Sequence, residues 1–227
     1  MENKKIVLKL GYLSAILCAA TFIGYIICFI GILSTSEMYM WTDFENYLEY
    51  VNENPQLFKH IAQLLMMLFV VSYLILTVTL NELVDANNKI FSKLSVSFAI
   101  IFAALVSIHY FIQISSVRIQ LLNKETEGLL QFIQGNPISA SSSINMLGWT
   151  LFFGLSSLFI FPVFKSGRKE KIIRAAFLTN GISCLAGGIG FIFQIDIITL
   201  ICMNLIMGAA VMAFSIGLIG YFKRCNK

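Results

Sequence analysis

The sequence predicts an all-α membrane protein, a bundle of six transmembrane helices with two amphipathic segments in its outer loops. Of its 227 residues, 58% are apolar and only 12% are charged, against about 25% charged residues in an average soluble domain. The mean hydropathy is +0.82. These values exclude a disordered chain, a disulfide scaffold and an ordinary soluble domain. No segment alternates between apolar and polar residues over about ten positions, so we expect helices and not a β-barrel.

Six stretches contain the roughly 20 largely apolar residues that a transmembrane helix needs. They cover residues 10–33, 60–80, 94–117, 144–164, 172–194 and 197–222. The whole chain, residues 1–227, is therefore expected to form one transmembrane domain, with long loops at residues 34–59 and 118–143. The first stretch exceeds the apolar core of about 7–15 residues in a signal peptide, so we expect this helix to remain. Almost nothing separates the fifth and sixth stretches, which predicts a tight antiparallel hairpin.

The positive charges predict the orientation. If the N-terminus is cytoplasmic, only Lys59, Arg118 and Lys124 lie in outer segments, and the other 13 of the 16 Lys and Arg residues lie inside. Because cytoplasmic loops of membrane proteins are enriched in these residues, we expect a multi-pass cell-membrane protein with both termini cytoplasmic. The net charge of +4 reflects this asymmetry and does not indicate nucleic-acid binding. The basic loop at residues 165–174 is expected to face anionic lipid headgroups.

The first outer loop is amphipathic. Thr42 and Glu45 have the spacing of a capping box, which marks the N-terminus of a helix. Trp41, Phe44 and Leu48 then follow at helical intervals, with acidic residues on the other side. This pattern predicts a short helix lying at the outer membrane interface.

The second outer loop is also too apolar to be simply solvated. The sequence at residues 135–137, Gly-Asn-Pro, is a strong helix stop, and Ser143 is a plausible N-cap of the fourth helix. Two interpretations remain open: the two loops fold over the outer mouth of the bundle as a lid, or each rests on lipid headgroups. The candidate lid residues are Trp41, Phe44, Leu48, Leu129 and Phe132.

Polar residues inside a membrane are costly and often functional. In the third span, His109, Gln113 and Ser116 follow one another at i, i+4 and i+7, so a regular α-helix places them on one face. Further polar groups occur at the outer level of the second, fifth and sixth helices. These are His60, Gln63, Gln194, Asp196 and Asn204. Together these eight residues predict an outward-facing pocket for a ligand.

A second interpretation is that the same groups only form hydrogen bonds between helices, each worth about 0.6 kcal/mol. Taken singly, Gln63, Asn180 and Asn204 fit this interpretation better than the pocket. His109 with Gln113 fits the pocket and the hydrogen-bond interpretation equally well. Small residues at four-residue spacing in the fifth helix, among them Gly188, also indicate a closely packed face.

The sequence contains no motif for a metal or a cofactor, and neither is predicted. His60 and His109 are the only histidines, and the five cysteines lack metal-ligand spacing. We expect the cysteines to be small buried hydrophobic residues. Ser116, His109 and Asp196 can be drawn as a catalytic triad, but any bundle with one histidine permits such a drawing. No catalytic residue is therefore assigned.

Short motifs in the middle of the chain carry a resemblance to a known group of proteins. The motifs are His109-Tyr110, Gln113, Arg118, Asn136-Pro137, Gly148-Trp149 and Pro162-Val163-Phe164. Over residues 94–174 the chain resembles uncharacterised six-helix membrane proteins of bacteria and archaea, known only as domains of unknown function. The resemblance implies a prokaryotic inner-membrane location and brings no reaction, substrate or cofactor.

The favoured function is the binding of a small molecule or lipid in the outward-facing pocket, as a sensor or as a subunit of an assembly. The expected partners are the lipid bilayer and this ligand, with homo-oligomerisation left open. The first alternative is a small oligomeric transporter or channel, which would need a polar path reaching the cytoplasm. The second is an intramembrane lipid-modifying enzyme with His109 as its base, and an enzyme is not favoured.

Overall fold

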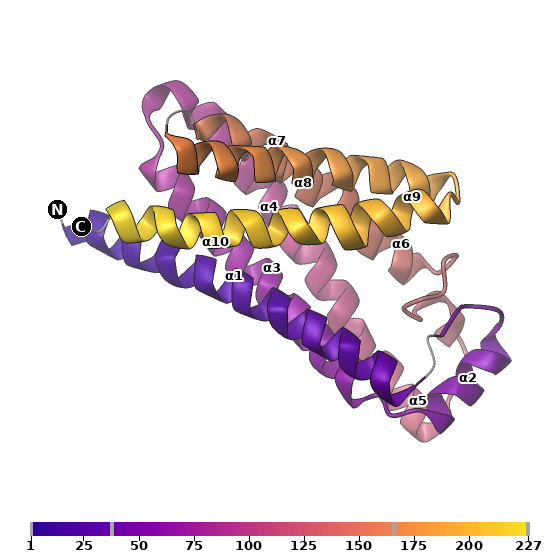
Figure 1. The fold of residues 1–227 in the computed structure, drawn as a ribbon. Helices are drawn as coiled ribbons and strands as arrows, with labels where there is room; N and C mark the ends of the chain where they lie inside the picture. The colour runs from indigo at the N-terminus through magenta and orange to yellow at the C-terminus, as the bar shows by residue number, and fades with distance from the viewer. Residues whose placement is uncertain (1, 37–38, 165–166, 226–227) are drawn as a thin grey trace.

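A computed structural model describes residues 2–36, 39–164 and 167–225, although not the side chains of Arg168 and Lys169. It is an all-α bundle with six helices long and apolar enough to cross a membrane (Figure 1). These spans are Glu2–Thr35, Leu57–Leu83, Ala86–Asn123, Ala140–Val163, Glu170–Ile192 and Asp196–Cys225. The predicted six-helix fold is therefore confirmed. Most spans are longer than predicted, because polar residues at their ends continue the helix beyond the apolar stretch.

Three of the spans are interrupted by π-helical turns. The regular helices are α1 (Glu2–Thr35), α2 (Phe44–Glu53), α3 (Leu57–Leu83), α4 (Lys89–Ile112), α5 (Arg118–Asn123), α6 (Ala140–Leu147), α7 (Phe153–Ile160), α8 (Arg168–Ile192), α9 (Asp196–Leu200) and α10 (Met207–Cys225). The π-helical segments are Gln113–Val117, Gly148–Phe152 and Ile201–Ile206. Each joins two α-helices into one continuous span.

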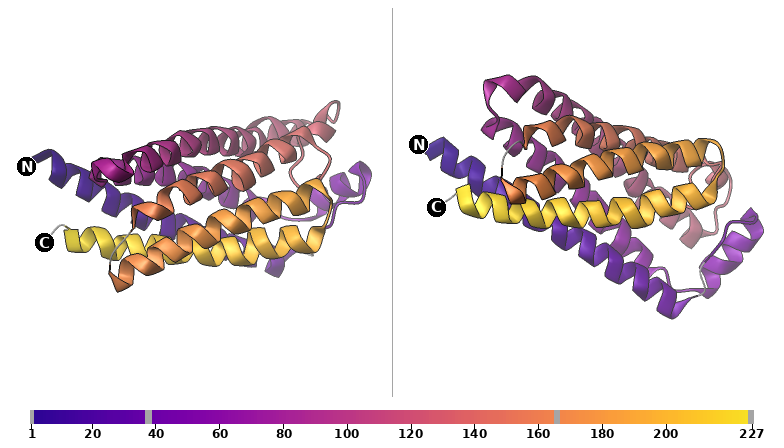
Figure 2. Two further views of the ribbon diagram at one scale, coloured as in Figure 1. Left: turned by 90° about the horizontal axis from the view of Figure 1, so that it is seen from above. Right: turned by 45° about the horizontal axis from the view of Figure 1, so that its top comes forward.

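The six spans form a closed ring in chain order. α1 packs against α3, α3 against α4, α4 against α7, α7 against α8 and α8 against α10, and α10 returns to α1. Both termini lie at one end of the bundle (Figures 1 and 2). We call the opposite end, which carries α2, α5 and the turn between α8 and α9, the distal end. The two long loops predicted to be outside both lie there.

Aromatic side chains fill the middle of the ring. Tyr73, Phe102 and Phe153 have no exposed surface, and the rings of Phe102 and Phe153 stack with centroids 4.6 Å apart. The Tyr73 hydroxyl lies 2.9 Å from Ser156 Oγ, which links α3 to α7. Such stacked rings and buried hydrogen bonds fix the relative positions of neighbouring helices.

The fifth span, α8, packs closely on α7, as its small residues predict. Asn180 is fully buried, and its Nδ2 donates to Ser157 Oγ at 2.7 Å, so the expected interhelical hydrogen bond is confirmed here. Gly181 approaches α7 so closely that a Cβ atom would lie 3.0 Å from the carbonyl oxygen of Gly154. Gly188 likewise leaves room for Thr150, whose Cβ would lie 2.9 Å from an added Cβ.

The two distal loops pack on each other and form a second, smaller hydrophobic core. Its buried residues are Tyr47, Val117, Leu129 and Ile133, and Trp41, Phe44 and Leu48 pack against them. We call this cluster the distal cap. Four of the five candidate lid residues belong to it, whereas Phe132 is 45% exposed and is not among its residues.

The predicted helix starts in this region are wrong by a few residues. The N-cap of α2 is Asp43 and not Thr42, and the Asp43 carboxylate accepts a hydrogen bond from the backbone N–H of Asn46. The N-cap of α6 is Ser139 and not Ser143. In both cases another residue with a short polar side chain takes the extended conformation that an N-cap needs.

The expected contact of the basic loop with headgroups stays a prediction. Lys165, at its start, lies outside the described residues, and so do the side chains of Arg168 and Lys169. The orientation of the bundle across a membrane also remains a prediction from the charges.

Candidate functional site

Gln113 anchors the second distal loop to the bundle. Its side chain is 3% exposed. Its Nε2 donates to the carbonyl oxygen of Phe132 at 2.6 Å, and its Oε1 accepts from the backbone N–H of Gln134 at 3.0 Å. The amide therefore satisfies two backbone groups of a loop in which exposed residues alternate with buried ones such as Ile133 and Asn136, and unpaired backbone groups in partly buried places are costly.

His109 is the second anchor. It is 1% exposed, and its Nδ1 lies 3.0 Å from the carbonyl oxygen of Ser141 and 2.8 Å from Ser141 Oγ. Because the carbonyl oxygen only accepts, this geometry assigns the proton to Nδ1. His109 holds the start of α6 and does not line a cavity with the other predicted site residues.

The predicted polar stripe ends at Gln113. Within the π-helical segment Gln113–Val117, the backbone N–H of Arg118 bonds to the carbonyl oxygen of Gln113, five residues back. A π-turn inserts an extra residue and rotates everything that follows. Ser116 therefore leaves the face of His109 and is exposed, contrary to the sequence prediction.

The predicted residues of the last hairpin also lie apart from the others. Gln194 and Asp196 are exposed at the turn between α8 and α9. Asn204 is exposed as well, beside an apolar cavity lined by Phe22 and Trp149, so the expected interhelical hydrogen bond is not formed.

His60, Gln63 and Gln113 do come together, in a cavity of about 230 Å³ beneath α2. Tyr47 and Val51 of α2 form its roof, and the ends of α3 and α4 with α5 form its walls. The cavity opens at the distal end. Of the eight predicted pocket residues, these three line it.

The cavity is electropositive. Lys59 and Arg118 line it, and no Asp or Glu is among the described residues that do so. The Lys59 ammonium donates to the Tyr47 hydroxyl at 3.4 Å and lies 5.3 Å from the centre of its ring. The acidic residues of α2 are exposed on its other side. They are Glu45, Glu49 and Glu53.

Tyr47 is suited to this contact. Burial, and to a smaller degree its neighbours Tyr39 and Tyr50, raises the pKa of the Tyr47 hydroxyl. The hydroxyl therefore stays neutral and accepts the hydrogen bond from Lys59 without pairing its charge. The positive charge remains available to an anion in the cavity.

Gln63 offers a second open group. It is 2% exposed, and its Nε2 donates to Gln134 Oε1 at 2.7 Å. Its own Oε1 is buried and has no hydrogen-bond partner among the described residues. A buried acceptor without a partner costs about 1–3 kcal/mol, which a ligand with a hydroxyl or N–H donor would recover.

The roof of the cavity depends on the N-cap of α2. Replacing Asp43 by alanine removes the bond to the Asn46 N–H and is expected to destabilise the helix by about 1 kcal/mol. Hydrogen exchange of the α2 amides should then accelerate about fivefold. Thr42→Ala is the matched control, because Thr42 accepts only from the exposed side chain of Asn46. Equal acceleration in both variants would contradict the assignment of Asp43 as the cap.

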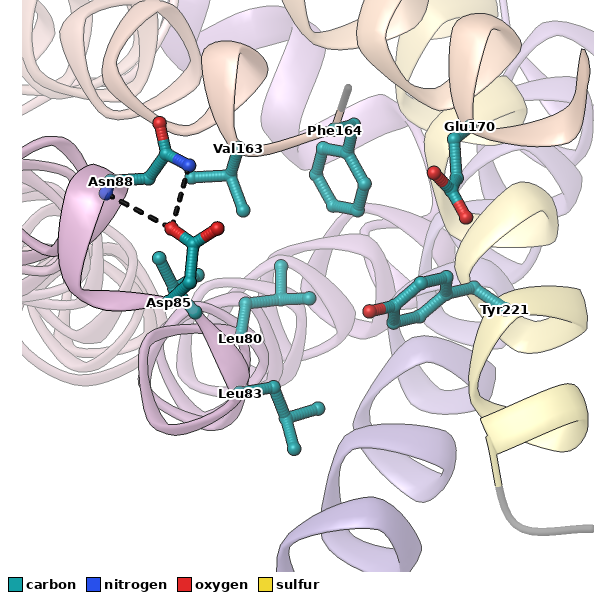
Figure 3. Close-up of a pocket in the computed structure, with 9 residues that line it drawn as sticks. Leu80, Leu83, Asp85, Asn88, Val163, Phe164, Glu170 and Tyr221 are labelled. Carbon is teal, nitrogen blue, oxygen red and sulfur yellow. Dashed lines mark hydrogen bonds between the residues drawn. The ribbon is translucent and has the colours of Figure 1, made fainter. Parts of the chain in front are cut away.

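A separate pocket, of about 170 Å³, lies at the opposite end of the bundle, which carries the termini. Figure 3 shows Asp85 and Asn88 on one side of it and Glu170 and Tyr221 on the other. Asp85 accepts from both the backbone N–H and the Nδ2 of Asn88, which closes the turn between α3 and α4. Because this carboxylate already caps a turn, the cavity beneath α2 is the stronger candidate site.

Comparison with protein-family models, curated proteins and solved structures finds no match to this chain. Among the described residues, no three His, Cys, Asp or Glu side chains gather where they could hold a metal ion.

Three residues in or beside the cavity were not predicted as site residues. Lys59 was predicted only as an outer charge, Arg118 as an outer charge and as part of the resemblance, and Gln134, the partner of Gln63, was not predicted. One signal was present: Lys59 directly precedes His60 and Gln63 at the start of a span. Their approach to α2 depends on the folding of the loops, which the sequence does not reveal.

Proposed function

We propose that this protein binds a ligand with an anionic group in the cavity beneath α2, and that it acts as a sensor or an assembly subunit. The observation that supports the proposal best is the Lys59 ammonium, held against a neutral tyrosine in a cavity whose described lining residues include no Asp or Glu. Arg118 adds a second positive charge. In a partly desolvated site such charges attract an anion more strongly than they do in water.

The proposal includes an orientation and a location. The distal end faces the outside of a prokaryotic inner membrane, as the distribution of positive charge and the resemblance in the middle of the chain both favour. The acidic outer side of α2 then faces water, and the positive cavity lies behind it.

Binding is better supported than transport. Towards the termini, the ring interior is filled by fully buried aromatic side chains, among them Tyr73, Phe102 and Phe214. A polar path through the bundle would have to displace them. An enzyme with His109 as base has less support, because the imidazole does not line the cavity, although its Nε2 has no hydrogen-bond partner among the described residues.

Charge-selective labelling tests the proposal. In a variant without the five native cysteines, Val51→Cys places a thiol in the cavity, and Glu49→Cys places one on the exposed side of the same helix. Intact cells are treated with methanethiosulfonates that carry either a sulfonate or a trimethylammonium group. The rate of each reagent with Val51→Cys is divided by its rate with a small free thiol in solution. This ratio should be about tenfold higher for the sulfonate reagent than for the cationic reagent.

The controls separate charge from access. Glu49→Cys should show no preference for the anion, and Lys59→Gln with Arg118→Gln should abolish the preference at position 51. A faster reaction of Val51→Cys with the cationic reagent would contradict an anion site. Labelling of Glu49→Cys only after permeabilisation would show that the distal end faces the cytoplasm.

A further inference from the structure

The anion site continues into the interior of the bundle. Lys59 and Gln63 also line a second cavity, of about 210 Å³, on the side of α3 that faces α1. Tyr25, Met66 and Tyr110 form its deeper part. The same three side chains line a third cavity, of about 140 Å³. The shared lining places the three cavities in a row that begins at Lys59 and runs inward.

The far end of this row is apolar. Besides aromatic rings, the third cavity is lined by Met146, Met203 and Met207, with Trp149 at 6% exposure. Methionine side chains are flexible and polarisable and adapt to irregular apolar ligands. The two inner cavities are each smaller than the roughly 300 Å³ of a pocket for a compact ligand, so their shape suits one narrow hydrocarbon chain.

The row also opens sideways. Phe29, which lines the second cavity, is 41% exposed on the surface of α1. On the other side, Asn204 is exposed beside the third cavity. Both residues lie in spans that cross the membrane. A ligand can therefore enter from the bilayer, between α1 and the segment Ile201–Ile206, as well as from water.

We infer that the ligand is an anionic lysophospholipid, which has one acyl chain, a free glycerol hydroxyl and a phosphate. This inference rests on the proposed anion site. The phosphate pairs with Lys59, the hydroxyl donates to the unpartnered Oε1 of Gln63, and the acyl chain extends past Met66 to Trp149. A lipid with two chains would need twice the apolar width, and a soluble anion would leave the inner cavities unfilled.

Tryptophan fluorescence gives a direct test. The chain has two tryptophans, so Trp41→Phe leaves Trp149 as the only one. The protein is reconstituted in nanodiscs of phosphatidylcholine and titrated with a lysophosphatidate whose chain carries two bromines at carbons 9 and 10. Bromine quenches an adjacent indole, so we expect saturable quenching of Trp149. The neutral methyl ester of the same brominated fatty acid should produce only weak quenching.

Two variants test separately the recognition of the lipid phosphate and of its acyl chain. Lys59→Gln should raise the lipid concentration needed for half-maximal quenching about tenfold, whereas Lys124→Gln, an exposed lysine of the same end, should not. Ala62→Leu adds bulk to the wall of the second cavity and should abolish quenching. Retention of the anion preference at Val51→Cys in this variant shows that it is folded.

The outcomes are distinguishable. Saturable quenching that is weakened by Lys59→Gln supports the inference. Equal quenching by the methyl ester, or in Lys59→Gln, would overturn recognition of the phosphate. If the lysophosphatidate produces no quenching while Val51→Cys keeps its anion preference, the lipid is not the ligand, but the anion site is still supported. Loss of both signals would reject the proposed function as well.

Discussion

Replacing Gln113 by leucine is expected to release the second distal loop from the bundle. The substitution leaves the carbonyl oxygen of Phe132 and the N–H of Gln134 without the partner that they have beside the buried Gln113 side chain. Each unpaired group costs about 1–3 kcal/mol. The amides of residues 129–139 should therefore lose at least about tenfold in protection from hydrogen exchange, and the distal cap should open.

Ser116→Leu is the matched control for this prediction. Ser116 lies three residues further along the same span and was predicted on the same face, but it is exposed. Its substitution should leave the exchange of residues 129–139 and the thermal midpoint nearly unchanged. If Ser116→Leu matched Gln113→Leu, the π-turn at residues 113–117 would not have the position described.

Replacing Gly181 by leucine should have the other large effect, at the contact of α7 and α8. An added Cβ would lie 2.4 Å from Leu158 Cγ and 3.0 Å from the carbonyl oxygen of Gly154. The backbone oxygen cannot move without separating the helices. Overpacking of this kind typically costs about 1–3 kcal/mol, and the rest of the larger side chain adds to it. The thermal midpoint in detergent should fall by several degrees.

Gly220→Leu tests whether the effect comes from packing. A Cβ added at Gly220 meets no heavy atom of the described residues within 4 Å. Because both glycines lie inside long helices, the two substitutions change helix propensity alike. A similar loss of stability in Gly220→Leu would assign the effect to something other than the α7–α8 contact.

The sequence was sufficient for the fold because the bilayer imposes a simple rule. A stretch of about 20 apolar residues crosses it as a helix, and all six predicted spans are present. The boundaries were less certain. Asp43 and Thr42 are both good N-caps, and in the folded chain it is Asp43 that accepts the hydrogen bond from the Asn46 N–H.

The site was only partly predictable, for two physical reasons. First, residues at i, i+4 and i+7 share a face only in a regular α-helix, and the π-turn that begins at Gln113 moves Ser116 off that face. Second, Gln113 bonds to backbone groups of a loop, and His109 bonds to the carbonyl oxygen and the hydroxyl of Ser141 at the start of α6. Backbone groups leave no pattern in a sequence. Polarity at depth therefore identified important residues, but it did not distinguish anchors of a loop from residues that line a cavity.

The order of the spans around the ring has a consequence for how the protein assembles. Five of the principal contacts join spans that follow one another in the chain, and the contact of α1 with α10 joins the first to the last. During membrane insertion each new span can pack at once on the one before it, whereas α1 must wait for the end of synthesis. The junction that closes last is also the one that no connecting loop bridges. Transient parting of α1 from the last span would admit a lipid tail without stretching any connection between consecutive helices.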